Sequence, residues 1–412
     1  MRFSWLILLC FLYPIVTHAQ SEIAGKVTRK DSKSPVAGAS VFLGNSSFGT
    51  ATASNGTFTL NGVKPGQYTL VVTIMGFEDY TQTVLVGKEP IKLNIELSPK
   101  SIILREVEIS TTAKADWKRN YEQFKKEFIG TDENAKNCEV INPEVLYFTY
   151  HKTQKVLEAS ADEFLIVENR GLGYRVKFLV RDFRSDHISG IISYSGQRLF
   201  QELPGKESQK KKWRSARDYA YYGSAMHFYR SLYKDRLVEE GFEMHHYTRL
   251  INPLRPPEEV IQRNQERYYK LRIRDSLIKW NDLEKLSIYH KETIYPMPLF
   301  TSEVLRSSGQ QGIFGITFPD LLYVIYNKKR EETPFREVYR TLTMPNYETT
   351  ILSFTDKNRP YSFFDMNGIL VGGGILNEGT WSKARLSELL PVDYVPTEDV
   401  ETTLKAELGK KH

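Results

Sequence analysis

The feature that most constrains the fold is a strict alternation of apolar and polar side chains near residue 94. Four apolar residues are each separated by one polar residue: Ile91, Leu93, Ile95 and Leu97. In an extended chain this period of two places all four on one face, whereas helical winding would scatter them. The same period recurs several times between residues 22 and 90. The sequence therefore predicts a series of short strands in this region.

Turn-forming residues separate these strands. Asn55 and Gly56 favour the positive φ angles of a tight hairpin, and Pro65 and Gly66 favour a turn before the next strand. About seven short strands with such breaks are typical of two antiparallel sheets packed face to face. We therefore expect an all-β Greek-key sandwich over residues 20–99.

Short motifs along this segment carry a family resemblance. They are Gly25-Lys26-Val27, residues 35–41 (PVAGASV), residues 55–60 (NGTFTL), residues 65–70 (PGQYTL), Met75-Gly76-Phe77 and residues 104–107 (LREV). Together they resemble the carboxypeptidase regulatory-like domain, a transthyretin-like sandwich. That family usually has an acidic residue ahead of the turn, where this chain has Ala53 and Ser54. In the family the domain is a non-catalytic companion of a peptidase or a front extension of outer-membrane receptors.

The chain lacks the usual signatures of a reaction centre. A zinc carboxypeptidase needs a His-x-x-Glu pair, and none of the eight histidines is followed by Glu at that spacing. His245 and His246 are adjacent, so on a strand they point to opposite faces and seldom share a metal. Ser195 lacks the first glycine of a serine hydrolase elbow, because Ser193 occupies that position. We assign no catalytic residue, cofactor or metal ligand from the sequence.

Residues 1–19 have the pattern of a secretory signal peptide. Arg2 supplies a positive charge, residues 5–12 form an apolar run, and Ala19 precedes the expected cleavage point. The apolar run is too short for a permanent span, so we expect no membrane span in the mature chain. We expect an exported protein of the periplasm or outer membrane. Cys138 would then be the single cysteine, and no internal disulfide could form.

The charge balance argues against a nucleic-acid partner. The 412 residues carry a net charge of +6, which falls to +5 without the signal peptide. The basic cluster at residues 210–212 is more typical of a solvated surface than of a polyanion site. We expect no nucleic-acid partner, and an envelope protein or a glycan instead.

The sequence predicts that residues 100–136 form a linker that contains one helix. Residues 102–110 read as a strand or as linker, and an amphipathic helix follows. Four aromatic residues at spacings of four, three and four share one helix face: Trp117, Tyr121, Phe124 and Phe128. Asp116 and Gly130 are expected to cap its ends. We expect the aromatic face to pack on the next domain.

Residues 137–396 predict a β-rich α+β domain. Residues 145–148 and 164–167 are continuous apolar runs, typical of strands covered on both faces, whereas residues 174–178 alternate. Other strands are expected near residues 286–289, 322–326 and 350–354, with a hairpin turn at Asn367-Gly368 and a short helix capped by Thr380 that ends at Pro391.

A central helix is expected over residues 213–242, interrupted at Gly223. His227 lies near its inner face, and Arg217 and Tyr221 lie on the same segment. A hydrogen-bonded core histidine is the ordinary interpretation, and a ligand or general base is the alternative. These three residues are the candidate functional positions. The tyrosines between residues 219 and 233 are expected to fill the junction of helix and sheet.

Two segments are expected to lie outside the core. Pro256 and Pro257 open a charge-rich insertion at residues 255–280, which suits a surface helix or an inserted arm. Residues 397–412 form a charged tail without an apolar stripe, and we expect disorder there.

The second domain has its own resemblance. Its motifs include residues 137–144 (NCEVINPE), residues 220–232 (AYYGSAMHFYRSL) and Gly379-Thr380-Trp381. These are similar to exported proteins of the Bacteroidota that are named only for their front domain, and this resemblance implies no activity.

Three functional hypotheses remain open. The leading one is a non-catalytic cell-envelope binding or adaptor protein. The first alternative is a hydrolase of unrecognised type, which predicts a cleft where His227 meets a carboxylate or hydroxyl. The second is a glycan-binding envelope protein, which requires an exposed row of aromatic side chains.

Overall fold

The computed structural model describes residues 21–100, 111–331, 338–341, 343–372 and 374–408. The predicted signal peptide and residues 102–110, predicted as a strand or a linker, lie outside these residues. Contacts between Cα atoms divide the chain into a first unit, residues 1–41 and 50–100, and a second unit, residues 42–49 and 101–412.

The N-terminal strands form the predicted sandwich. The strands are β1 (Ser21–Arg29), β2 (Ser40–Leu43), β3 (Gly49–Ala51), β4 (Thr57–Val63), β5 (Gly66–Thr73), β6 (Tyr80–Val86) and β7 (Ile91–Leu97). They make two sheets, in the orders β4-β1-β7 and β3-β2-β5-β6. On β7 the alternation behaves as predicted, because Ile95 and Leu97 are buried while Asn94 and Glu96 are exposed.

One turn in this unit differs from the prediction. Gly56 has a φ of +78°, and its N–H donates to the Ala53 carbonyl at 2.8 Å, so the expected turn is present. However, β3 and β4 belong to different sheets. The turn therefore carries the chain from one sheet to the other and does not close a hairpin.

The second unit begins with a six-stranded antiparallel sheet. Its strands are β8 (Cys138–Val140), β9 (Leu146–His151), β10 (Val156–Ala161), β11 (Leu165–Asn169), β12 (Tyr174–Asp186) and β13 (Ile191–Glu202). The order is β8-β11-β12-β10-β9, and β13 pairs with β12 along its whole length. The long β12 pairs with β11 through its first half and with β10 through its second.

Helix α2 (Thr111–Ile129) covers one face of this sheet, as its aromatic stripe predicted. Phe124 and Phe128 are fully buried, and their ring centroids lie 4.8 Å from Phe183 and 5.1 Å from Phe178. Gly130, with a φ of +111°, follows the last helical residue as expected.

Two predictions about this region are wrong. The helix starts at Thr111, so Asp116 is not its cap but pairs with Arg119 at 2.9 Å within the helix. Strand β9 is not covered on both faces, because Leu146 is buried while its neighbour Tyr147 is 43% exposed.

The remaining strands form two more sheets. A five-stranded sheet has the order β15-β14-β18-β19-β22, and a four-stranded sheet has the order β16-β17-β20-β21. The strands are β14 (Phe242–Ile251), β15 (Tyr289–Pro298), β16 (Leu305–Ser307), β17 (Ile313–Ile316), β18 (Leu321–Arg330), β19 (Tyr347–Phe354), β20 (Ser362–Asp365), β21 (Leu370–Gly372) and β22 (Ile375–Gly379). The predicted turn at Asn367-Gly368 joins β20 to β21, as expected. All three sheets and the helices between them share one contiguous apolar core, which extends from Phe124 to Tyr394.

The predicted central helix is three helices. These are α3 (Glu207–Tyr221), α4 (Ala225–Tyr233) and α5 (Leu237–Glu240). The chain breaks at Gly223, which has a φ of +82°, and the Ser224 hydroxyl then caps α4 by accepting the His227 N–H. Helix α8 (Thr301–Val304) follows β15.

The C-terminal predictions need two corrections. Thr380 is the first residue of α9 (Thr380–Lys383), and its hydroxyl accepts the Thr349 N–H at 3.0 Å instead of capping the helix. A separate 3-10 turn at Leu386–Glu388 precedes Pro391. The tail forms α10 (Val400–Leu408), where Thr403 is only 2% exposed, so disorder is the wrong expectation for this part.

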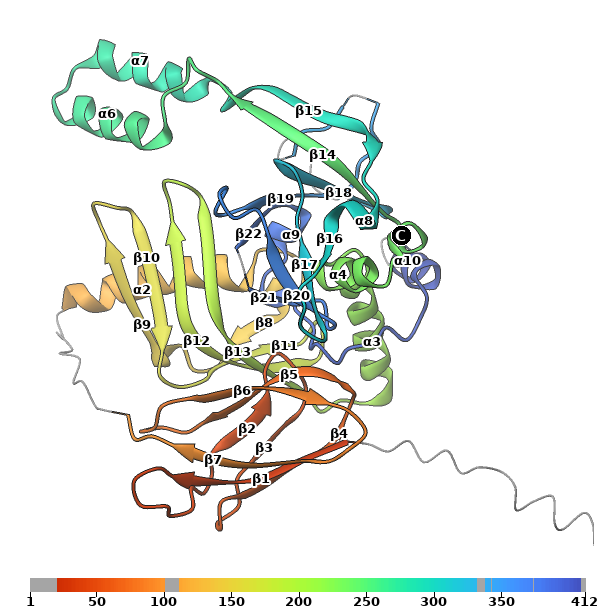
Figure 1. Cartoon of the computed structure of the whole chain (residues 1–412). Helices are drawn as coiled ribbons and strands as arrows, with labels where there is room; N and C mark the ends of the chain where they lie inside the picture. Colours follow the sequence, from red (N-terminus) through yellow and green to blue (C-terminus); the bar gives the residue numbers. More distant parts are fainter. Residues whose placement is uncertain (1–20, 101–110, 332–337, 342, 373, 409–412) are drawn as a thin grey trace, which may run out of the picture. The chain divides into compact units, whose positions relative to one another are not determined.

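The charged insertion at residues 255–280, expected as a surface helix or an inserted arm, lies within an arm of two strands and two helices. Strand β14 pairs with β18 only as far as Tyr247, but its pairing with β15 continues to Ile251 opposite Tyr289. This ribbon carries α6 (Glu258–Lys270) and α7 (Arg274–Lys285), which lie side by side at its far end (Figure 1). We call residues 248–292 the arm. Among the helices of the described residues, none has the length and hydropathy needed to cross a bilayer.

Candidate functional site

A small pocket surrounds His227. Its volume is about 120 Å³, enough for a few water molecules, and α3, α4, α5 and Pro396 line it. The titratable and cationic side chains in its wall include Tyr221, His227, Arg230, Lys234 and Glu240. The structure thus brings two of the three candidate residues, His227 and Tyr221, to one place.

Both ring nitrogens of His227 are occupied by protein groups. The Gly223 N–H donates to Nδ1 at 3.2 Å, and Nε2 lies 3.2 Å from a carboxylate oxygen of Glu240. Since Nδ1 accepts, Nε2 carries the proton and donates it to Glu240. The imidazole is therefore neutral, and it has no lone pair directed into the pocket.

The electrostatics of this pair agree with a neutral histidine. Burial lowers the pKa of His227, and the hydrogen bond from His227 lowers the pKa of the Glu240 carboxyl. The Tyr221 ring lies 4.9 Å from the imidazole, and burial raises the pKa of its phenol. At neutral pH the pocket thus holds an ionised carboxylate, a neutral imidazole and a protonated phenol.

Arg217 lies in a different setting. Its guanidinium donates to the carbonyls of Leu172 and Gly173, pairs with Glu202 at 2.9 Å and lies 3.8 Å from the centre of the Tyr174 ring. Each of these contacts joins α3 to the six-stranded sheet or to the turn that precedes β12. Arg217 lines neither pocket described here.

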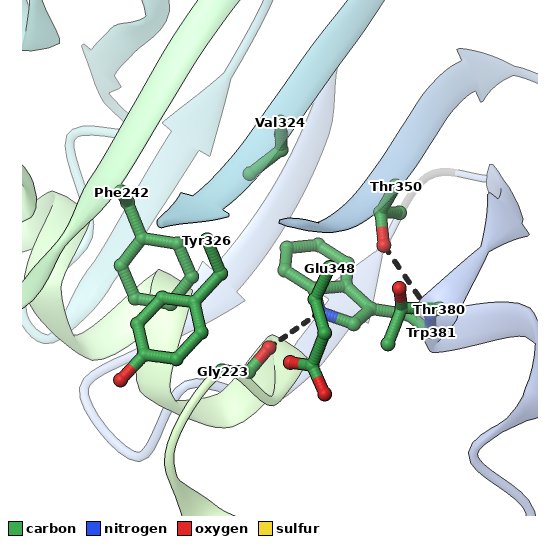
Figure 2. A pocket seen from close by; sticks show the side chains of 8 residues that line it. All are labelled: Gly223, Phe242, Val324, Tyr326, Glu348, Thr350, Thr380 and Trp381. Carbon is green, nitrogen blue, oxygen red and sulfur yellow. Dashed lines mark hydrogen bonds between the residues drawn. The ribbon is translucent and has the colours of Figure 1, made fainter. Parts of the chain in front are cut away.

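The cavity beside Gly223 is filled by its own lining. Figure 2 shows Trp381 donating its indole N–H to the Gly223 carbonyl, at 2.7 Å, and its backbone N–H to the Thr350 hydroxyl. No space for a water molecule remains among these side chains. The region is a packed junction between α3, β19 and α9.

The other chemical candidates are equally occupied. His245 and His246 lie on β14 and point apart, as predicted: one ring contacts the Tyr295 carbonyl and the other Asp320. Burial raises the pKa of the Cys138 thiol to about 12, so it stays protonated at neutral pH. Among the described residues, no three His, Cys, Asp or Glu side chains come together as a metal site requires.

The most unusual surface of the described residues is the arm. Nine of the 23 exposed large apolar side chains lie in its 45 residues, while Ile261 is the single apolar side chain there that is buried. Five of the nine gather where the ribbon meets the helices, and we call them the ribbon patch: Leu250, Ile251, Leu254, Leu286 and Ile288. Backbone contacts hold the two sides of this patch together, since the Asn252 N–H donates to the Ile288 carbonyl at 2.9 Å.

Polar contacts hold the arm at both ends. At its base, Arg249 bonds to Glu292 and Glu378, and its side chain is only 8% exposed. Further out, Lys155 in the β9–β10 turn pairs with Glu266 of α6 at 2.5 Å. The two helices are joined by Gln265, which donates to Asn281. The arm that carries the apolar patch is therefore joined to the rest of the unit near both of its ends.

Sequence reasoning found the arm but not its exposed patch. It also missed Glu240, Arg230 and Lys234 as neighbours of His227. No regular alternation in β14 marks the patch, because Tyr247, Leu250 and Ile251 do not follow a period of two.

Comparison with known proteins identifies the first unit. Residues 23–109 match the family model of the CarboxypepD_reg-like domain. This agrees with the resemblance in the sequence motifs and with the two-sheet sandwich. A search of curated protein sequences found no match.

Several solved structures are similar in part. A cohesin–X-dockerin complex from Acetivibrio cellulolyticus is 19% identical over 19% of this chain and 56% of that chain, with a TM-score of 0.17. A proposed carbohydrate-binding protein from Bacteroides uniformis is 9% identical over 36% of this chain and 53% of that chain, with a TM-score of 0.17. A proposed membrane-associated protein of unknown function from Bacteroides fragilis is 9% identical over 87% and 93%, with a TM-score of 0.16.

The chain spans about half the length of the first two of these structures. TM-scores this low carry no argument about function.

Proposed function

We propose that this protein is an exported, non-catalytic binding protein of the cell envelope that docks a partner protein on the ribbon patch. The observation that carries the proposal is the exposure of that patch. Leu254, Ile251 and Ile288 are 74%, 69% and 52% exposed, and the bond from the Asn252 N–H to the Ile288 carbonyl brings their segments together at the root of the helical hairpin. Exposed apolar side chains that cluster are typical of protein-binding surfaces.

The patch cannot be covered by the arm itself. The helices α6 and α7 bury one apolar side chain between them, Ile261, and therefore have almost no core of their own. Folding the patch inward would also break the β14–β15 register that positions it. A partner is therefore the surface that would remove these side chains from water, at about 25 cal/mol per Å² of apolar area.

The polar contacts of the arm favour binding. A docking surface that is already in its bound conformation loses less conformational entropy when the partner arrives. Arg249 and the Lys155–Glu266 pair supply that order at the two ends of the arm. The non-catalytic role of the front domain in its family agrees with this function, and the signal-peptide pattern supports the envelope location.

The alternatives have weaker support. A hydrolase would need a free base at His227, where Gly223 and Glu240 occupy both ring nitrogens. A glycan site would need an exposed aromatic row, but the tyrosines of the helical region are largely inside: Tyr221, Tyr222 and Tyr229 are each less than 9% exposed.

Affinity capture from envelope extracts of the native host tests the proposal. Three baits are compared: the unaltered chain, a patch variant (Ile251→Ser, Leu254→Ser and Ile288→Ser) and a control variant with three exposed apolar changes outside the arm (Met75→Ser, Val238→Ser and Val371→Ser). We expect the same partner with the unaltered and control baits and its loss with the patch variant. Equal capture by all three baits would refute the patch as the docking surface.

A further inference from the structure

The end of α6, the short loop after it and the first residue of α7 have an unusual composition. Residues 267–274 read RYYKLRIR, so four basic side chains alternate with aromatic and aliphatic ones and no acidic residue interrupts them. The flanking acids are Glu266, which is already paired with Lys155 at 2.5 Å, and Asp275. We call residues 267–274 the tip.

Three of the four aromatic and aliphatic side chains of the tip are exposed. Tyr269, Leu271 and Ile273 are 74%, 56% and 44% exposed. The tip lies at the end of the helical hairpin farthest from the ribbon (Figure 1). It is thus separated from the ribbon patch by the length of both helices and shares no residue with it.

Two basic side chains of the tip do little for the fold. Arg272 and Arg274 form no ion pair with any described residue, and both are exposed. Arg274 is the first residue of α7, where the helix dipole disfavours a cation. Helix stability therefore gives no reason for a positive charge at this position, and an external anionic surface does.

We propose that the tip binds the surface of an anionic phospholipid bilayer. Its cations would lie at the headgroup phosphates, and Leu271 and Ile273 would enter the boundary between headgroups and acyl chains, with Tyr269 at the interface. Interleaved basic and apolar side chains on an exposed helical element are the pattern that such surfaces attract. The two aliphatic side chains favour lipid over nucleic acid, since bases offer stacking faces that aliphatic groups do not use.

This inference goes beyond the proposed function, because it concerns a second surface and a different class of partner. The arm would hold the protein at a membrane by its tip while the ribbon patch remains open to a protein. Loss of one activity leaves the other intact, so the two proposals fail separately.

Vesicle co-sedimentation tests the tip. The chain from Ser21 onward is mixed with vesicles of phosphatidylglycerol and phosphatidylcholine, or of phosphatidylcholine alone, at low and high salt. We expect sedimentation with the anionic vesicles, weakened by salt, and little with the neutral ones. Removing two surface cations (Arg272→Ser with Arg274→Ser) should weaken anionic binding about 30-fold.

A matched variant controls for net charge. Arg263→Ser with Lys279→Ser removes two exposed cations from the same two helices but outside the tip, and it should bind nearly as well as the unaltered chain. Leu271→Ser with Ile273→Ser should weaken binding to the anionic vesicles but leave the salt dependence of that binding unchanged. Circular dichroism checks that each variant is folded.

Three results would overturn the proposal. They are no sedimentation of the unaltered chain with anionic vesicles, an equal loss in the tip and control variants, and binding to a single-stranded oligonucleotide without binding to vesicles.

Discussion

The Arg249 guanidinium donates to both carboxylate oxygens of Glu378, at 2.8 and 2.9 Å, and so joins the base of the arm on β14 to β22, three strands away in the sheet order. The same side chain reaches Glu292 on β15 at 3.2 Å. Because the ribbon leaves the sheet at this point, Arg249 ties the base of the arm to the sheet. The proposed docking function depends on the arm being held in this position.

Replacing Arg249 should loosen the arm. In Arg249→Met the charge-assisted bonds to Glu292 and Glu378 are lost, and we expect the free energy of unfolding to fall by about 1.5–3 kcal/mol. Chymotrypsin should also cut the arm faster, since the ribbon loses its anchor. Arg263→Met, at an exposed position of α6, is the control. Unchanged cleavage in Arg249→Met would mean that the anchor lies elsewhere.

A methyl group at Gly223 should disrupt the junction below the His227 pocket. The added Cβ would lie 2.6 Å from a Glu348 oxygen and 2.7 Å from a Tyr326 ring carbon, in a backbone with a φ of +82°. We expect Gly223→Ala to lower the free energy of unfolding by about 2 kcal/mol or more. Gly87→Ala, with no heavy atom within 4 Å of its Cβ, should change it little. Urea unfolding measures both, and equal stability of the two variants would contradict the packing described here.

His227 should contribute to the pH dependence of stability. Burial holds its pKa below the ordinary 6.5, so the unfolded chain binds this proton more tightly than the folded one. The contribution of His227 to stability is therefore complete above about pH 6.5 and is lost as the pH falls through the lowered pKa. Between about pH 7.5 and about pH 5.5, the unaltered chain should lose more stability than His227→Gln does. His290→Gln, at an exposed position, controls for the loss of a histidine. An identical pH dependence in the unaltered chain and His227→Gln would show that the imidazole is not held neutral.

Glu388 should change the pH dependence of stability in the opposite direction from His227. Burial first, and then the nearby Asp132 carboxylate, raise the pKa of its carboxyl above the ordinary 4.5. The folded chain thus binds this proton more tightly than the unfolded chain does. The contribution of Glu388 to stability is therefore complete below about pH 4.5 and is lost as the pH rises through the raised pKa.

In Glu388→Gln the charge is absent while the amide oxygen can still accept the Asn134 bond. This variant should be more stable than the unaltered chain at neutral pH and equal to it near about pH 4. Thermal unfolding at the two pH values measures the difference, with the exposed Glu401→Gln as the control. A loss of stability at neutral pH would count against the assignment.

Local patterns in the sequence were sufficient for much of the fold. The alternation on β7 and the aromatic stripe of α2 each report which side of an element faces the core, and this depends only on the period of the element. The same reasoning failed for β9, because a run of apolar residues does not reveal that a sheet has one uncovered face. It also failed for α10, which packs against α3 with Thr403 buried although its sequence has no apolar stripe.

The candidate sites depended on contacts that no local pattern contains. Glu240 meets His227 because the chain turns after α4 and returns through α5, and the residues in that turn do not encode the approach. The segments that carry Leu254 and Ile288 are far apart in sequence and are brought together by the pairing of β14 with β15, which ends at Ile251 opposite Tyr289. These side chains are exposed because β18 pairs with β14 only as far as Tyr247 and does not extend along the ribbon. The relative lengths of two strands cannot be read from either strand alone.

The most direct test of the central claim is site-specific photo-crosslinking in the native host. A photoreactive residue replaces Leu254 in the ribbon patch or, as the control, Val238 on α5, which is 85% exposed and outside the arm. The account predicts a discrete crosslinked partner protein from position 254 and none from position 238. No crosslinked product from the arm, or the same products from both positions, would contradict it.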